Sequence, residues 1–410
     1  MTRLLLDNVR PFDSRRGKLG PPSRIVVEGA RIAEVTSEPR TVDGARRIDG
    51  GGRVALPGLI DAHVHVTAYM HDLMGQALKP PSLIVAESSR ILRAMLLRGF
   101  TTVRDAAGAD FGLQEAVAKG LFAGPRLFIA GFPISQTGGH ADMRPKGVRQ
   151  REMFCTCAGL GLIGAIADGV GEVRRAVREQ VRNGANQIKI MAGGGISSPS
   201  DPLEGTQFSI DELRAACEEA EAANLYAMAH AYSPRAVTRA VQAGVRSIEH
   251  GNLIREAAAK AIKDAGAFLV PTMITYEMIY REGKRYGIGD HQIQKINLAR
   301  EQSVQGLTYA YRAGCQIGSG SDLLGDMMVQ RAVEFELKAQ VMKPMEVLLS
   351  ATKVNAALFR LSDRIGTVEP GKYADLIVVA GDPLRNLRVF QIQDNLKVIM
   401  KGGHAYKQTL

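Results

Sequence analysis

Two histidines one residue apart end a short apolar segment near the start of the chain. His63 and His65 belong to the segment LIDAHVHV (59–66). Side chains alternate along a β-strand, so both imidazoles are expected on the same face. A single buried histidine is more often a core residue than a ligand, but a pair on one face favours metal binding. Because imidazole is a common ligand of Zn²⁺, the spacing predicts the start of a metal site.

Three more imidazole or carboxylate side chains end other apolar segments. His230 follows the letters YAMA, His250 ends SIEH and Asp322 ends GSGSD. Each residue alone also fits a cap, a turn or the core. Five nitrogen and oxygen ligands at the ends of predicted strands indicate a shared site. This donor set favours Zn²⁺, with Mn²⁺, Co²⁺ and Fe²⁺ as less favoured alternatives.

Lys189 lies between two isoleucines in another apolar segment, QIKIMAGG (187–194). A buried ammonium group without a partner is unfavourable. One interpretation is a lysine at the strand margin that reaches solvent or a carboxylate. The other is chemical, because burial lowers the pKa of the amine and a neutral amine can add CO₂. The resulting carbamate is an anion with two oxygens, which suits a bridge between two cations.

These side chains need a scaffold whose strand ends converge, and the middle of the chain predicts one. Eight apolar segments alternate with segments of helical periodicity. The predicted strands are 59–66, 101–108, 125–131, 186–194, 225–232, 247–251, 268–273 and 316–322, and the predicted helices include 88–100, 209–224 and 233–244. Ser233 is expected to cap the last helix, with Pro234 at its first position.

This alternation predicts an α/β fold, a parallel (β/α)₈ TIM barrel, with a doubly wound sheet as the alternative. In such a barrel, catalytic groups lie at the carboxyl ends of the strands. The two chain ends differ, because residues 1–57 and 362–410 contain short β-rich segments separated by turns. Neither end is large enough to fold alone. We therefore expect them to pair in a small β-sandwich beside a barrel formed by residues 58–361.

Composition restricts the class of protein. The chain has 410 residues, is 45% hydrophobic and carries a net charge of +10. It has no apolar run long enough for a membrane span and no signal peptide pattern, so we expect a cytoplasmic protein with no membrane partner. Basic and acidic residues alternate and tryptophan is absent, so no nucleic acid partner is expected. An anionic small-molecule substrate or a slightly basic surface accounts for the net charge, and a homo-oligomer stays open.

The four cysteines are too few for a disulfide framework in a chain of this length. Cys155 and Cys157 form an isolated C-x-C pair. No second pair follows at the spacing of a metal site, so the role of these two residues stays open.

The whole pattern resembles the amidohydrolase superfamily, in the branch with a binuclear metal centre and a carboxylated lysine. The resemblance covers nearly the whole chain. It rests on PGLIDAHVH (57–65), on Lys189, His230, His250 and Asp322, and on the returning segment GTVEPGKYADLIVVAGDP (366–383). It implies two divalent metal ions, with Zn²⁺ expected. The implied ligands are His63, His65 and Asp322 on the buried metal, His230 and His250 on the exposed one, and a carbamate on Lys189 together with a hydroxide between them.

Three local segments are similar to bacterial enzymes that cleave Xaa-Pro dipeptides and N-acyl-prolines. They are ISQTGGHAD (134–142), KIMAGGGISSPSDP (189–202) and AHAYSPRA (229–236). The resemblance implies that His140 and Tyr232 polarise the scissile carbonyl and stabilise the oxyanion. It also implies that Asp322 carries the proton from the hydroxide to the leaving nitrogen.

Three functions compete. The first is hydrolysis, by the metal-bridging hydroxide, of dipeptides or N-acyl amino acids with a free carboxylate. Xaa-Pro is the leading substrate, and Arg, Lys or an aromatic, ochratoxin-like leaving group is the alternative. The second is a cyclic amide hydrolase or deaminase of the same superfamily. Tyr232 stands where mononuclear deaminases carry a glutamate, and mononuclear cyclic amidases lack a lysine like Lys189. The third, a non-catalytic scaffold, is disfavoured by the full ligand set. Arg144 is a candidate for binding the substrate carboxylate on charge alone.

Overall fold

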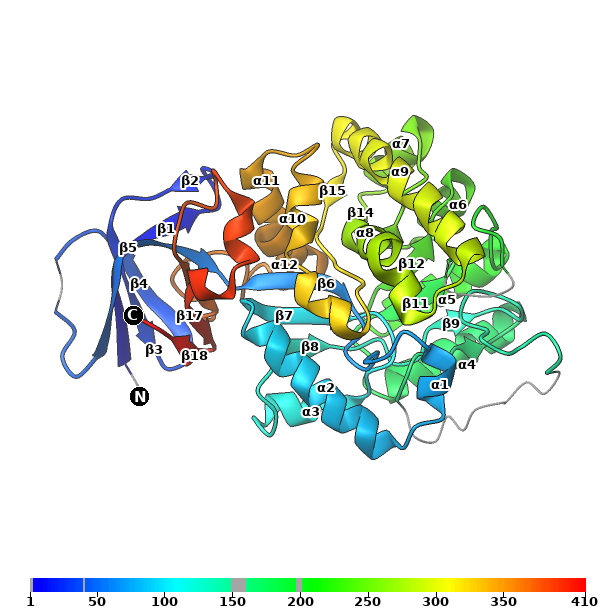
Figure 1. Ribbon diagram of the computed structural model, residues 1–410, viewed down its shortest axis with the longest axis horizontal. Coiled ribbons are helices and arrows are strands. Elements are labelled where there is room, and N and C mark those ends of the chain that lie inside the picture. Colours follow the sequence, from blue (N-terminus) through cyan, green and yellow to red (C-terminus); the bar gives the residue numbers. More distant parts are fainter. Residues whose placement is uncertain (1–2, 40, 149–159, 197–200) are drawn as a thin grey trace.

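The computed structural model describes residues 3–39, 41–148, 160–196 and 201–410. Strands from the two chain ends, blue and red in Figure 1, share one part of the molecule. The other part runs from the blue strand β6 (Leu59–Val64) to the orange helices, and in it helices surround parallel strands. None of the described helices is long and apolar enough to cross a membrane.

Each of the eight segments predicted as barrel strands contains a strand. They are β6 (Leu59–Val64), β7 (Phe100–Asp105), β8 (Arg126–Phe128), β11 (Ile188–Met191), β12 (Ala227–Ala231), β13 (Ser247–His250), β14 (Phe268–Val270) and β15 (Gln316–Ile317). Two short strands, β9 (Ile134–Ser135) and β10 (Ala165–Ile166), were not predicted. Strands of two residues are too short to show an alternating pattern in the sequence.

The parallel strands form two sheets, ordered β6-β7-β8 and β10-β9-β11-β12-β13-β14-β15. Backbone hydrogen bonds join the three-stranded sheet to the seven-stranded one on both sides, near β6 and near β8. Ala62 N donates to Ser319 O at 2.9 Å on one side, and Asn186 N donates to Ile129 O at 2.8 Å on the other. The structure confirms a mixed α/β fold with parallel strands. The assigned strands do not form one closed ring, so the barrel stays a prediction.

Helices connect most of the parallel strands, and three more α-helices follow the last of these strands. They are α1 (Leu73–Ala77), α2 (Pro81–Leu96), α3 (Phe111–Ala118), α4 (Gly169–Arg182), α5 (Ile210–Ala222), α6 (Pro234–Gln242), α7 (Glu256–Asp264), α8 (Met273–Glu282), α9 (Asp290–Ala313), α10 (Val333–Lys338), α11 (Pro344–Leu349) and α12 (Asn355–Leu358). The helix predicted for 88–100 was placed too late, because it begins at Pro81 and ends at Leu96. Gly99 has a φ of +86° and Phe100 already begins β7, so the helix cannot continue.

The predicted cap of α6 is confirmed. The Ser233 hydroxyl accepts a hydrogen bond from Ala236 N at 3.2 Å, and Pro234 occupies the first turn. Ser209 caps α5 in a capping box with Glu212. These caps fix where each helix leaves the preceding strand end, which is where the candidate ligands lie.

The chain ends build one mixed sheet. Its strands are β1 (Arg3–Asp13), β2 (Lys18–Leu19), β3 (Ser23–Glu28), β4 (Arg31–Thr36), β5 (Arg46–Pro57), β16 (Leu376–Val379), β17 (Leu396–Lys401) and β18 (His404–Gln408). Their order is β18-β17-β16-β5-β1-β3-β4, with β2 beside β1. The two ends therefore pair directly, while the sandwich arrangement and the domain boundaries at 57/58 and 361/362 stay predictions.

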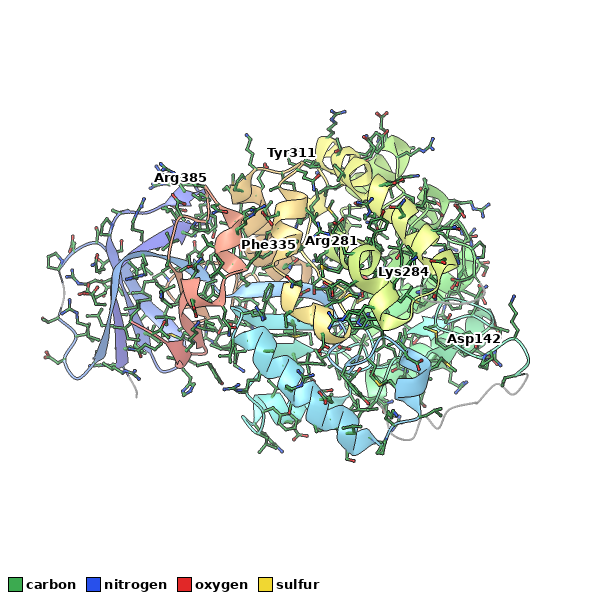
Figure 2. All side chains as sticks on the ribbon, in the orientation of Figure 1. Asp142, Arg281, Lys284, Tyr311, Phe335 and Arg385 are labelled. Atoms are coloured by element: carbon green, nitrogen blue, oxygen red, sulfur yellow. The ribbon has the colours of Figure 1, made fainter. Side chains whose placement is uncertain are left out.

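Strand β16 separates two hydrophobic cores. Leu376 packs in the core of the chain-end sheet, whereas Ile377, on the opposite face, packs in the large core of the remaining chain. Figure 2 shows Phe335 of α10 close to the C-terminal segment, and its ring lies edge-on to that of Phe390 at 5.4 Å between centroids. Apolar packing therefore joins the chain-end sheet to the part that holds the candidate site.

Candidate active site

The predicted ligands converge at the carboxyl ends of the parallel strands. His63, Lys189, His230 and His250 lie on strands β6, β11, β12 and β13, and His65 and Asp322 follow β6 and β15. Together with His140 and Tyr232 they line one pocket of about 740 Å³, a volume that includes the solvent at its mouth. The other lining residues are largely apolar and include Leu73, Pro133, Met191, Ile196, Ile279 and Leu324.

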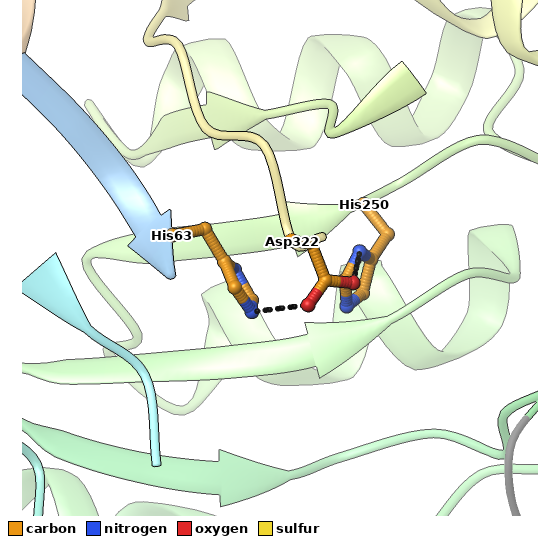
Figure 3. Close-up of side chains that lie close together, drawn as sticks. All are labelled: His63, His250 and Asp322. Atoms are coloured by element: carbon orange, nitrogen blue, oxygen red, sulfur yellow. Dashed lines mark ion pairs between the residues drawn. The ribbon is translucent and has the colours of Figure 1, made fainter. Parts of the chain in front are cut away.

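Asp322 lies at the centre of the imidazole group. One potential ligand atom from each of His63, His250 and Asp322 lies within 4.8 Å of the other two (Figure 3). Asp322 Oδ1 is 3.4 Å from His63 Nε2 and 3.2 Å from His65 Nε2. Two imidazoles and a carboxylate at this separation form a group that can hold a metal ion.

The orientation of the other rings fits a metal. His65 Nδ1 faces the carbonyl oxygen of Ala107 at 3.0 Å, and His230 Nε2 faces that of Gly194 at 3.1 Å. A carbonyl oxygen only accepts, so each of these nitrogens carries the ring proton. The lone pair is left on His65 Nε2 and on His230 Nδ1. Metal-binding histidines have this arrangement, in which one nitrogen donates to an acceptor and the other binds the metal.

Burial keeps most of these imidazoles neutral. It lowers the pKa of His63 and of His230 well below the ordinary value, and that of His250 to about 3. Burial alone would lower the pKa of His65 too. The hydrogen bond to Asp322 and the negative charge of that carboxylate instead raise this pKa above its ordinary value. Burial alone would raise the pKa of the Asp322 carboxyl. The neighbouring imidazoles outweigh this effect and hold that pKa below its usual range. Neutral imidazoles and an ionised carboxylate are the forms that bind metal ions.

Lys189 is buried beside this group, with a relative exposure of 2%. Burial lowers the pKa of its amine to about 8, although the charges of Glu249 and Asp322 favour the ammonium form. No hydrogen bond or ion pair joins Lys189 to any other residue that the structure describes. The interpretation of a lysine that reaches solvent or a carboxylate therefore has no support in the described part of the chain.

The backbone of His250 redirects its ring. Strand alternation would place residue 250 on the same face as Ile248, which packs in the large core outside the pocket. His250 instead has a φ of +77°, and its ring lies 5.1 Å from that of His63 between centroids. Asp322 also has a positive φ, +52°. Such strained backbone at a strand end is typical of functional sites, and the sequence pattern did not reveal it.

Asp61 ties the first strand to the segment that carries Asp322. Its carboxylate accepts hydrogen bonds from Ser321 N at 3.0 Å and Ser321 Oγ at 2.6 Å, and it pairs with the buried Arg331 at 3.1 Å. Gly320 allows the close approach, because a Cβ there would lie 2.7 Å from His63 Cβ. These contacts hold Asp322 against His63 of β6 and His65, which follows it.

His140 lies beside His230. The two rings stack at 4.2 Å between centroids, and His140 Nδ1 lies 3.3 Å from Asp201 Oδ2. A Cβ on Gly195 would lie 2.0 Å from His140 Cε1. This glycine therefore makes room for the His140 ring.

Two site residues, Thr272 and Tyr276, were not predicted from the sequence. The Tyr232 hydroxyl lies 2.9 Å from the Tyr276 hydroxyl, and Thr272 Oγ1 lies 2.8 Å from His250 Nδ1 and 3.4 Å from the Tyr276 hydroxyl. Thr272 has a φ of +45°, which is unusual for a β-branched residue. It lies two residues after the end of β14, so the rule that polar residues at strand ends are functional could have found it. Tyr276, inside α8, carries no such signal.

Arg144 does not line this pocket. It lies in an adjoining pocket, where its Nε donates to Asp142 Oδ1 at 2.6 Å (Asp142 is labelled in Figure 2). Its charge is therefore already paired with a carboxylate. Cys155 and Cys157 lie outside the residues that the structure describes.

Comparisons with known proteins show which family this chain belongs to. The sequence profile of the Amidohydrolase family matches residues 54–405. The ochratoxinase of Aspergillus niger is 31% identical over 95% of this chain and 84% of its own length. A prolidase solved with N-methylphosphonate-L-proline is 43% identical, with a TM-score of 0.96 over the whole of both chains. A Xaa-Pro dipeptidase solved with bound methionine is 28% identical, with a TM-score of 0.89 over 99% of this chain and 100% of that one. The chain therefore belongs to the amidohydrolase family of hydrolytic enzymes.

Proposed function

We propose that this amidohydrolase cleaves the amide bond of dipeptides or N-acyl amino acids that carry a free carboxylate, with Xaa-Pro as its leading substrate. The observation that carries the proposal is the convergence of four imidazoles, Asp322 and buried Lys189 in one pocket that also contains His140 and Tyr232. Support for proline comes from the 43% identical prolidase that was solved with a proline phosphonate.

We further infer two divalent metal ions, with Zn²⁺ expected, held by His63, His65, Lys189 as its carbamate, His230, His250 and Asp322. The donor set fits, because each of His65 and His230 turns one nitrogen to a carbonyl and keeps a lone pair on the other. When bound, the metals supply Lewis acidity that activates water and polarises the scissile carbonyl. We place these ligands at the mouth of a (β/α)₈ barrel beside a β-sandwich.

The protein's own groups then divide the remaining work. The Asp322 carboxylate takes the proton of the attacking water and delivers it to the leaving nitrogen. The Tyr232 hydroxyl and the His140 imidazole donate to the carbonyl oxygen as negative charge develops there. The apolar wall around Leu73, Met191 and Ile279 excludes water and accommodates a side chain without charge.

The charges in the pocket favour an apolar leaving residue. Among the described residues that line it, Asp322 is the one carboxylate. An Arg or Lys leaving residue would place a cation in this pocket without a free carboxylate to pair with it. A proline ring or an aromatic ring needs no such partner. This is why Xaa-Pro is preferred here over a basic leaving residue.

An aromatic leaving residue is the second candidate. The 31% identity to the Aspergillus niger ochratoxinase over 95% of this chain favours it, and the same apolar wall accommodates an aromatic ring. The identity to the prolidase is higher, so proline remains the first choice.

The test is a substrate panel with the Zn²⁺-loaded protein. Ala-Pro, N-acetyl-Pro, N-acetyl-Phe and N-acetyl-Arg test the leaving residue. Ala-Pro amide lacks the free carboxylate, and a hydantoin tests for opening of a cyclic amide. We expect the highest kcat/KM for the proline compounds and a large loss for the capped amide. A preference for N-acetyl-Phe would refute proline alone, whereas efficient opening of the hydantoin with no cleavage of the linear amides would refute the class.

A further inference from the structure

We propose that Glu249, paired with Arg104, is a positioning residue that fixes the tautomer of His63, so that His63 Nε2 presents its lone pair to the metal site. This inference rests on the proposed metal ligands and extends them to two residues beneath the pocket. Neither Glu249 nor Arg104 lines the pocket itself. Both would therefore act through His63 rather than on the substrate.

Glu249 is fully buried and its two carboxylate oxygens have separate partners. Oε2 lies 2.7 Å from His63 Nδ1. Oε1 accepts from Arg104 Nη2 at 2.8 Å and from the Ser247 hydroxyl. Arg104 is also fully buried, and its Nε donates to Ala62 O at 2.7 Å, which fixes the direction of the guanidinium group. The pair is therefore held by the strands that surround it.

The chemistry of these partners determines where the His63 proton lies. A carboxylate only accepts hydrogen bonds, so a 2.7 Å contact with Glu249 requires the proton on His63 Nδ1. His63 Nε2 is then unprotonated, and it faces Asp322 in the pocket. A metal-binding histidine needs this arrangement, and a carboxylate behind the ring is a known way to obtain it. A buried Glu249 without Arg104 would be an unpaired charge, which explains the ion pair.

Glu249→Gln should reverse the tautomer without changing the size of the side chain. Arg104 can only donate, so it would hold the amide oxygen on its own side. The amide NH₂ group would then face His63 Nδ1, which would have to accept. The proton would move to His63 Nε2, the nitrogen that faces the pocket, and that nitrogen could no longer bind a metal.

The experiment measures the tautomer and the metal affinity, and it needs no substrate. Metal-free protein labelled with ¹⁵N-histidine is examined by NMR, and a His63→Asn variant assigns the His63 signals among the eight histidines. We expect a protonated Nδ1 in the native protein and a protonated Nε2 in Glu249→Gln. Competition with a coloured chelator should show a loss of metal affinity of about 10- to 100-fold in that variant. Glu334→Gln is the matched control, because Glu334 is a buried glutamate that accepts from Ile274 N outside the pocket.

Several outcomes would overturn the inference. A native protein with the proton on His63 Nε2 refutes it without any variant, so the test survives even if Glu249→Gln fails to fold. An unchanged tautomer in Glu249→Gln, or a reversed tautomer with unchanged metal affinity, also refutes it. Failure of the proposed substrate class would appear only in the amide panel and would leave these readouts unaffected.

Discussion

The hydroxyl oxygens of Tyr232 and Tyr276 lie 2.9 Å apart in the buried wall of the pocket. This contact is the last of three that form a chain. His250 Nδ1 contacts Thr272 Oγ1, Thr272 Oγ1 contacts the Tyr276 hydroxyl, and the Tyr276 hydroxyl contacts that of Tyr232. If the proton on His250 Nδ1 starts this chain, each hydroxyl accepts from the previous group and donates to the next. The hydrogen of Tyr232 is then free to point into the pocket, where the developing oxyanion needs a donor.

Tyr276→Phe should lower kcat by about tenfold and change KM by less than about twofold, because the lost contact orients a donor used mainly in the transition state. Tyr232→Phe should lower kcat by about 10²- to 10³-fold. The double variant should be no worse than Tyr232→Phe alone, since Tyr276 acts through Tyr232. Tyr280→Phe, an exposed change on the same helix, is the control. A Tyr276→Phe variant that only raises KM would contradict this order of contacts.

Thr272 tests the other end of the same chain. Thr272→Ser keeps the hydroxyl and removes the β-branch at a positive φ, so metal affinity should stay within about twofold. Thr272→Val keeps the shape but leaves His250 Nδ1 without an acceptor, and metal affinity should fall by about tenfold or more. Chelator competition on the two variants gives the comparison. Equal affinities would show that the hydroxyl is unimportant for His250.

Metal content is the direct test of the proposed centre. Protein loaded with Zn²⁺ and freed of excess ion should approach two metal ions per chain. The expectation rests on the number of imidazole and carboxylate ligands that line one pocket. A reproducible value of one metal ion with full activity would refute a binuclear centre and favour the mononuclear branch.

Lys189→Ala should lose metal and activity together, because the proposed carbamate holds both ions. A short carboxylic acid added to the variant should partly restore both. Lys263→Ala, at an exposed position of α7, should change neither. An active crystal in which Lys189 is a bare ammonium group would contradict the carbamate.

The lowered pKa of Lys189 predicts a pH dependence of assembly. With a pKa of about 8, roughly a tenth of the amine is neutral at pH 7, compared with less than about one part in a thousand for an ordinary lysine. Only the neutral amine adds CO₂. At a constant concentration of dissolved CO₂, recovery of activity from metal-free protein supplied with metal should therefore speed up as pH rises toward 8 and level off above it. A rate that still rises tenfold per pH unit above pH 9 would indicate an ordinary lysine.

Local patterns predicted much of the framework around the site. Strand periodicity placed the eight parallel strands, and the alternation rule put His63 and His65 together at the end of β6. The position of His230 and Asp322 at the ends of predicted strands identified them as well, and both line the pocket. Their roles as ligands remain predictions, but their convergence is a feature of the fold.

What the sequence could not supply depends on tertiary contacts. The positive φ of His250 cannot be deduced from residue type, because such backbone is held by the surrounding structure rather than by local preference. Glu249 gave a weak signal as an acidic residue inside a buried strand, but its partner Arg104 lies far away in the sequence. Tyr276 looks like any aromatic residue of a helix until its hydroxyl is seen beside Tyr232.

The pairing of the two chain ends also has a consequence during protein synthesis. Strand β5 hydrogen-bonds to β16, with Leu56 opposite Ile377, so its partner leaves the ribosome only after the whole pocket-bearing part has been made. Until then, the edge of β5 that β16 later covers has unpaired backbone groups, and such edges invite aggregation. Contacts so distant in the chain also slow folding. The nascent chain is therefore most vulnerable just before its last strands emerge, and a chaperone that shields this edge would act in that interval.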